Sequence, residues 1–71
     1  MERIRIKSSD LRSVGYDEPM QILEIEFHQG GIYQYFGVPK KIYDGLMKYE
    51  SSHGQYHIRY IKNRYRREKV L

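Results

Sequence analysis

Residues 21–39, QILEIEFHQGGIYQYFGVP, constrain the fold more than any other stretch of this chain. Leu23, Ile25 and Phe27 alternate with polar residues, a Gly-Gly pair follows, and apolar and aromatic residues then return. Alternation on both sides of a turn signal is typical of two antiparallel strands joined by a short loop. The stretch therefore predicts a β-hairpin, with strands over 21–28 and 31–36.

The length of the hairpin loop decides which way the tyrosines point, because a shift of one residue turns a strand over. A two-residue turn pairs Phe27 with Ile32 and places Tyr33 and Tyr35 on the outer face. A three-residue loop with a glycine bulge instead pairs Ile25 with Tyr33 and buries both tyrosines. Partial exposure of a tyrosine to solvent costs less free energy than partial exposure of an Ile or Phe, because the phenol hydroxyl can still bond to water. We therefore favour the first register and keep the second open.

Weaker local patterns predict the elements on either side of the hairpin. Gly15 inside a strand pattern indicates a bulge or a close backbone contact. Pro39 suits the first turn of a helix, because its missing N–H is not needed there. The expected elements are a short strand or ordered arm over 1–7, a strand over 11–16, a turn over 17–20, a helix over 39–49, a helix stop over 51–54, a helix over 55–64 and a frayed end.

Together these elements predict an α+β single domain, a small antiparallel β-meander of three to four strands followed by two short α-helices packed on one face. We expect an N-terminal arm or edge strand over 1–7, the folded domain over 8–65 and a basic C-terminal tail over 66–71. The positions predicted to form the core are Leu11, Val14, Leu23, Ile25, Phe27, Ile42, Leu46 and Ile61.

Length and composition exclude several classes of protein. The chain has 71 residues, enough for one small domain. It has no cysteine, which excludes disulfides, thiolate metal sites and a cysteine nucleophile, and makes a cytoplasmic location, in a bacterial-type or other cytosol, the simplest expectation. No apolar run approaches the ~20 residues that span a bilayer, so we expect no membrane association.

Positive charge is concentrated in the second half of the chain, where tyrosines alternate with basic residues. Residues 1–36 carry four Lys/Arg and six Asp/Glu, whereas residues 37–71 carry nine and three. Basic side chains neutralise phosphates and tyrosine rings stack on bases, so this composition suits single-stranded nucleic acid. We expect Tyr35 and Tyr65 to stack on bases, and the phosphate contacts to come from Arg59, Lys62, Arg64, Arg66 and Arg67.

The same C-terminal block has a purely structural interpretation. On one continuous helix, Arg59, Lys62 and Arg66 would form a basic stripe. Ile58, Ile61 and Tyr65 would then be the buried face, and the charges would simply be the solvated one. Both interpretations remain open from the sequence.

Nothing in the sequence predicts catalysis, a metal or a cofactor. His53 and His57 have the i, i+4 spacing of helical zinc ligands, but Gly54 interrupts the pair and no further ligand completes the set. The chain has neither a nucleophile elbow nor a phosphate loop. Glu24 and Glu26 imply no pocket and are expected to be solvated. We therefore expect a non-enzymatic protein.

Four segments of the chain, in this order, resemble the KTSC domain. They are residues 8–17 (SSDLRSVGYD), 23–27 (LEIEF), 30–39 (GGIYQYFGVP) and 42–47 (IYDGLM), and the likeness extends to residue 65. The family takes its name from a segment at the C-terminus of some lysyl-tRNA synthetases, and small free-standing bacterial and phage proteins also belong to it. RNA binding has been suggested for the family, so the resemblance implies a small domain with that partner class and no catalytic residues.

One departure from the family pattern lies near the C-terminus. Family members usually carry Phe and Asn after the tyrosine that corresponds to Tyr56, where this chain has His57 and Ile58. A ligand that needed the Phe and Asn side chains would not be expected to bind this chain.

The leading functional hypothesis is a non-enzymatic nucleic-acid-binding module that takes RNA or single strands through its basic, tyrosine-containing C-terminal segment. The alternative is a small docking or inhibitory module that binds an acidic protein partner, since Tyr and Arg are enriched at protein interfaces. A third hypothesis is a homo-oligomer that shelters a small nucleotide. The sequence does not decide among them, nor does it give the oligomeric state.

Overall fold

A five-stranded antiparallel sheet, with its strands side by side in chain order, carries the fold. The computed structural model describes residues 1–48 and 53–71. The strands are β1 (Ile4–Arg5), β2 (Leu11–Asp17), β3 (Ile22–Phe27), β4 (Ile32–Phe36) and β5 (Arg67–Lys69). The predicted α+β class and antiparallel meander are confirmed, but the sheet has one strand more than the three to four expected.

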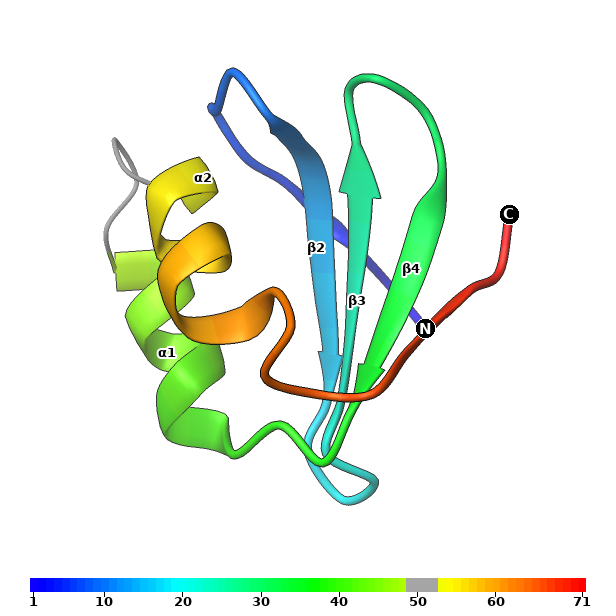
Figure 1. The fold of residues 1–71 in the computed structure, drawn as a ribbon, viewed down its shortest axis with the longest axis vertical. Helices are drawn as coiled ribbons and strands as arrows, with labels where there is room; N and C mark the ends of the chain where they lie inside the picture. Colours follow the sequence, from blue (N-terminus) through cyan, green and yellow to red (C-terminus); the bar gives the residue numbers. More distant parts are fainter. Residues whose placement is uncertain (49–52) are drawn as a thin grey trace.

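The helical segments lie against one face of the sheet (Figure 1). They are α1 (Lys40–Lys48), α2 (His53–Tyr56) and η2 (His57–Ile61), of which η2 is a π-helical turn. Among the described residues, no helix is long and apolar enough to cross a membrane.

The predicted helix over 39–49 is present as α1. The carbonyl of Pro39 accepts a hydrogen bond from the N–H of Ile42 at 3.0 Å, which opens the first turn. The predicted end at residue 49 and the stop at 51 and 52 lie outside the described residues. Gly54, expected to end a helix, lies within α2 instead.

Tyrosines fasten α1 to the sheet. The ring of Tyr16 on β2 stacks on that of Tyr43, with centroids 4.7 Å apart and planes inclined by 9°. The Tyr16 hydroxyl donates to the carbonyl of Val38 at 2.6 Å, just before α1 begins. Leu46, one turn further along the helix, is fully buried. This contact fixes α1 across the sheet and sets one wall of the cleft described below.

The core matches most of the predicted list. Leu11, Val14, Leu23, Ile25, Leu46 and Ile61 are fully buried. Phe27 and Ile42 are partly buried and pack against that cluster. The core also contains two side chains that are absent from the predicted core list, Tyr35 and Val38, both without solvent exposure.

The favoured hairpin register is wrong, and the three-residue loop is the one observed. Ile25 pairs with Tyr33, as that alternative requires. Gly30 and Gly31 have φ of 109° and 94°, whereas a two-residue primed turn would have required positive φ from the glutamine before them. We had argued that this register would expose Ile32 to water, but Ile32 on the outer face is only 7% exposed.

The N-terminal arm crosses the outer face of the sheet, opposite the helices. Arg3 Nε donates to Ser13 Oγ at 3.0 Å, and its guanidinium pairs with Glu24. A Cβ at Gly15 would meet the carbonyl of Glu2, so only glycine lets the arm pass this closely. The close backbone contact expected at Gly15 is therefore confirmed.

The arm also corrects the expectation that Glu24 is solvated. Glu24 is 6% exposed, and its carboxylate accepts hydrogen bonds from Gln34 Nε2 at 2.9 Å and from Arg3. Burial raises the pKa of Glu24, but these two hydrogen bonds more than offset it, so the net pKa is below the ordinary value. A buried carboxylate is tolerated here because the arm supplies its partner.

The predicted helix over 55–64 ends early, and the tail is a strand. The π turn closes with a hydrogen bond from Lys62 N to His57 O at 2.8 Å, and Asn63 then takes φ of 63° and redirects the chain. The last residues pair with β4, and Phe36 N donates to Arg66 O at 2.9 Å. The prediction of a frayed C-terminal end is wrong. Without these residues, the edge of β4 would expose a row of unpaired N–H and C=O groups, and the pairing satisfies them.

Candidate functional site

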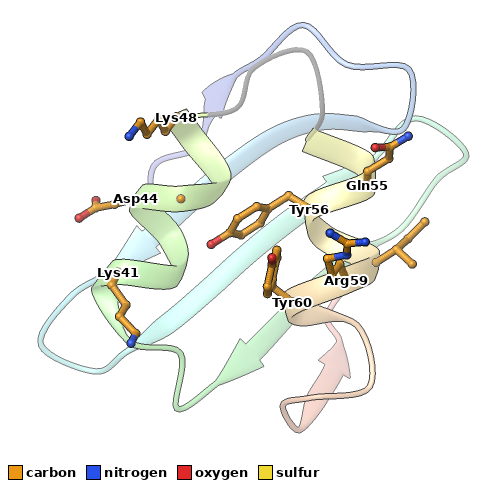
Figure 2. Close-up of a pocket in the computed structure, with 9 residues that line it drawn as sticks. Lys41, Asp44, Lys48, Gln55, Tyr56, Arg59 and Tyr60 are labelled. Carbon is orange, nitrogen blue, oxygen red and sulfur yellow. The ribbon is translucent and has the colours of Figure 1, made fainter.

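A cleft of about 840 Å³ separates α1 from the α2–η2 segment. Figure 2 shows the side chains that line it from both sides. Lys41, Asp44, Gly45 and Lys48 come from α1, and Gln55, Tyr56, Ile58, Arg59 and Tyr60 from the opposite wall. Both walls are helical, so these side chains are held on packed elements.

The cleft is shaped by a contact between Gly45 and Tyr56. A Cβ at Gly45 would collide with the Tyr56 hydroxyl, so the absence of a side chain on α1 makes room for the ring. Tyr56 in turn lies beside Tyr60, with ring centroids 4.6 Å apart and planes inclined by 43°. Tyr60 is 41% exposed and offers part of its ring to solvent. Figure 2 shows both rings on the same side of the cleft.

Positive charge exceeds negative charge around this cleft. Lys41, Lys48 and Arg59 line it against the single carboxylate of Asp44. Lys40 Nζ lies 2.9 Å from an Asp44 oxygen, and this hydrogen bond and ion pair raise the pKa of Lys40. Because Asp44 is paired in this way, its opposition to an anion in the cleft is reduced.

The structure distributes the five predicted phosphate contacts among separate places. Arg59 lines the cleft, whereas Lys62 and Arg67 line a second cavity. Arg66 lies with its guanidinium carbon 5.0 Å from the Phe36 ring centroid, and Arg64 Nε donates to Arg59 O at 3.0 Å. The single basic stripe is wrong, because the helix that would have carried it ends at residue 61.

The two predicted base-stacking tyrosines are packed against the protein. Tyr35 is fully buried, and its hydroxyl is 2.9 Å from His57 Nε2. Burial raises the pKa of Tyr35, against a smaller opposing effect of Arg67. Tyr65 is partly buried against the core. A base cannot reach the ring of Tyr35, so Tyr35 is removed from the candidate site.

Sequence reasoning missed the α1 side of the cleft. Lys41 and Lys48 are seven residues apart, a spacing that places them on the same face of a helix, and that signal was available. Asn63 was a second missed signal, because Asn tolerates the left-handed conformation that ends helices. The contact of Gly45 with Tyr56 had no local signature, since it joins two helices.

No metal site is evident in residues 1–48 and 53–71, where no three His, Cys, Asp or Glu side chains come together as ligands. The cleft instead offers ring faces, amide and ammonium donors, and a guanidinium. These groups can stack on a flat ring and hold an anion beside it.

Comparisons with other proteins place this geometry in context. Residues 7–65 match the family model of the KTSC domain. A crystal structure of a KTSC domain protein from Yersinia pestis superposes with a TM-score of 0.93 at 34% identity, over 99% of this chain and 97% of that one. A protein of Stutzerimonas stutzeri strain A1501, described only as uncharacterized, is 45% identical over 51 residues, which are 72% of each chain. A lysine–tRNA ligase of Nostoc punctiforme is 30% identical over 67 residues, 94% of this chain and 12% of the ligase.

Proposed function

This chain belongs to the KTSC domain family, and on that premise we propose that it is a non-enzymatic nucleic-acid-binding module that takes single-stranded RNA in the cleft between α1 and the α2–η2 segment. The observation that carries the proposal is the Tyr56–Tyr60 ring pair, set in a cleft bordered by Lys41, Lys48 and Arg59. Rings flanked by cations are the combination that single strands require, stacking for the bases and charge for the phosphates.

RNA is favoured over DNA by one relative. A lysine–tRNA ligase of Nostoc punctiforme contains a segment that is 30% identical to this chain over 67 residues, and this similarity supports the choice of RNA. The chemistry of the cleft adds that the strand must be unpaired, because a base within a duplex cannot place its face on Tyr60.

Salt dependence is the first test. Each phosphate contact on a single strand contributes about 0.7 to the slope of log affinity against log salt, so Lys41 and Arg59 together predict about a sevenfold loss between 50 and 200 mM salt. Fluorescence anisotropy with a labelled eight-nucleotide RNA measures the affinity at both concentrations. Binding without salt dependence, or no binding at low salt, contradicts the proposal.

Substitutions locate the binding surface. The double variant Lys41→Ala/Arg59→Ala should lose most of the salt dependence and weaken binding at low salt. Its matched control is Arg5→Ala/Lys7→Ala, which removes the same two charges from exposed positions on the N-terminal arm. Equal losses in the two double variants would show attraction to net charge alone, and would contradict a site in the cleft.

Tyr60 provides a test of stacking that leaves the charge unchanged. Loss of one base-stacking ring costs about 1–3 kcal/mol, so Tyr60→Ala should weaken RNA binding at least fivefold. Tyr60→Phe keeps the ring and should bind like the original chain. An unchanged affinity in Tyr60→Ala would remove this ring from the site.

A second candidate function uses the same cleft to bind an acidic protein. Ile58 favours it, because this side chain is 60% exposed in the lining of the cleft that also holds the exposed Tyr60, and exposed aliphatic and aromatic side chains are a feature of protein interfaces. Ile58→Ser separates the two functions: docking of a protein would be weakened, while RNA binding through ring faces and cations would be retained.

A further inference from the structure

A second, smaller cavity of about 370 Å³ lies on the other side of η2. Phe27, Tyr33 and His57 supply its aromatic lining, and Lys62 and Arg67 bring positive charge. Ile58 lines both this cavity and the α1 cleft, so the π turn forms the ridge between them. The RNA-binding proposal uses none of the five residues named first.

His57 is buried, and only one of its two ring nitrogens has a hydrogen-bond partner among the described residues. The residue is 5% exposed, and its Nε2 is 2.9 Å from the Tyr35 hydroxyl. Tyr35 keeps its proton because burial raises its pKa, so the hydroxyl donates to Nε2 and the ring proton resides on Nδ1. Within the described part of the chain, Nδ1 has no hydrogen-bond partner. A buried donor normally has one, so a ligand group in the cavity would satisfy it.

The charges of the cavity favour an anion. Two cations, Lys62 and Arg67, and one carboxylate, Asp10, line the cavity with His57, and all three charges affect the imidazole. The Arg67 guanidinium carbon lies 5.2 Å from the centroid of Tyr33, so one face of the guanidinium is stacked. Part of the guanidinium also interacts with the Tyr35 hydroxyl, and its other N–H groups are donors that suit a phosphate.

The size and chemistry of the lining narrow the anion further. Ligand pockets begin at about 300 Å³, so this cavity suits one small molecule and excludes a stretch of polymer. An inorganic phosphate would leave the ring edges of Phe27 and Tyr33 without contact. Asp10 adds an acceptor that suits a hydroxyl group. A ring, hydroxyl groups and a phosphate in one small molecule describe a ribonucleotide.

We propose that this second cavity binds a single ribonucleoside monophosphate unit, with the phosphate on Lys62 and Arg67, the base against Phe27 and Tyr33 and hydrogen-bonded to His57 Nδ1, and the ribose near Asp10. The unit has two sources, a free nucleotide or the phosphorylated end of an RNA strand. The inference is independent of the RNA site in the cleft, because the two sites share only Ile58.

Titration with 5′-adenylate, followed by backbone amide chemical shifts, tests the site. Saturable shifts are expected in the β3–β4 loop, in residues 57–62 and at Arg67. Adenosine and inorganic phosphate each represent one part of the probe and should bind at least about tenfold more weakly. Adenosine lacks the charge-assisted hydrogen bonds of the phosphate, and inorganic phosphate lacks the contact of the base with the aromatic rings. Phosphate binding as tight as that of 5′-adenylate, or no saturable shift, overturns the proposal.

Paired lysine variants make the test specific. Lys62 is exposed, so Lys62→Ala should fold normally, which its own spectrum verifies, and weaken 5′-adenylate about tenfold. Lys7→Ala, at an exposed position of the N-terminal arm, is the matched control and should leave this affinity unchanged. Loss of affinity in Lys41→Ala and not in Lys62→Ala would assign the nucleotide to the cleft and overturn the second site.

Two short RNAs distinguish the sources. A 5′-phosphorylated strand that shifts the second cavity at lower concentration than 5′-adenylate identifies the strand end, provided that the 5′-hydroxyl strand does not. Shifts from 5′-adenylate alone identify a free nucleotide. Shifts confined to the cleft with all three probes overturn the second site and leave the RNA proposal intact.

Discussion

Lowering the pH from 7 to 4 will destabilise this fold through one buried imidazole. Burial, with repulsion from Lys62 and Arg67, lowers the pKa of His57 from 6.5 to about 4. The unfolded chain therefore takes up a proton as the pH falls through 6.5, whereas the folded chain takes it up only near pH 4. Stability is complete above pH 6.5 and is lost through that window, by about 3 kcal/mol at pH 4.

The variant His57→Phe isolates this effect. It keeps a flat aromatic ring against Phe27 and Tyr35, whose ring centroids lie 5.2 and 5.6 Å from that of His57, and removes the titrating group. It also leaves the Tyr35 hydroxyl without its buried partner, which costs about 1–3 kcal/mol at every pH. The double variant Tyr35→Phe/His57→Phe removes both polar groups and should recover part of that loss.

Urea unfolding at pH 7, 5.5 and 4, followed by circular dichroism, measures the free energy of unfolding of each chain. The other titrating groups are common to all variants, so the difference between the original chain and His57→Phe reports His57 alone. We expect that difference to move by about 3 kcal/mol in favour of the variant between pH 7 and 4. A difference that stays constant within about 0.5 kcal/mol would refute the buried neutral imidazole.

Two further predictions concern the outer face of the sheet. Gly15→Ala should destabilise the fold by about 1–3 kcal/mol, because the new methyl group displaces the arm at Glu2; chemical unfolding measures this, and deletion of residues 1–3 should abolish most of the penalty. Glu24 has a lowered pKa, so its contribution is complete above 4.5 and is lost as the pH falls below that value. The stability advantage of the original chain over Glu24→Gln should therefore shrink below pH 4.5 in acid unfolding curves, and an advantage that grows there would contradict the paired carboxylate.

Local signals were sufficient where an element is decided by its own residues. The alternation of Leu23 and Ile25 gave β3, and Pro39 with Leu46 gave α1 and its buried face. Six of the eight predicted core positions are fully buried for the same reason. These are places where propensity, period and burial agree.

The wrong predictions concern segments whose structure depends on residues far away in the sequence. The register of the hairpin was argued from an outer face open to water, but Ile32 on that face is only 7% exposed, and its backbone pairs with the C-terminal residues Val70 and Leu71. The tail was expected to fray as a chain end beyond the last helix, yet it pairs with the edge of β4 as β5. Glu24 is buried because Arg3, far away in the sequence, reaches it. No local window contains these partners.

The cleft depends partly on local sequence and partly on contacts between distant segments. Arg59 and the tyrosines of the C-terminal block were visible in the sequence as a basic, aromatic composition, although Tyr35 turned out to be inaccessible. The approach of Tyr56 to Gly45 was not visible, since it depends on how α2 packs against α1. Composition thus led to the hypothesis of a nucleic-acid partner, and only the packing of the helices defined the cleft in which that hypothesis can be tested.

The π turn of η2 has a consequence for insertions and deletions. It closes from Lys62 N to His57 O, one residue longer than an α-helical turn. After deletion of residue 58 or residue 60, the same hydrogen bond from Lys62 N to His57 O would close an ordinary α turn, so the segments before His57 and after Lys62 would keep their relative positions. The π turn thus marks the place in this chain where the loss of one amino acid can be absorbed within a single turn, while the sheet and α1 stay the same.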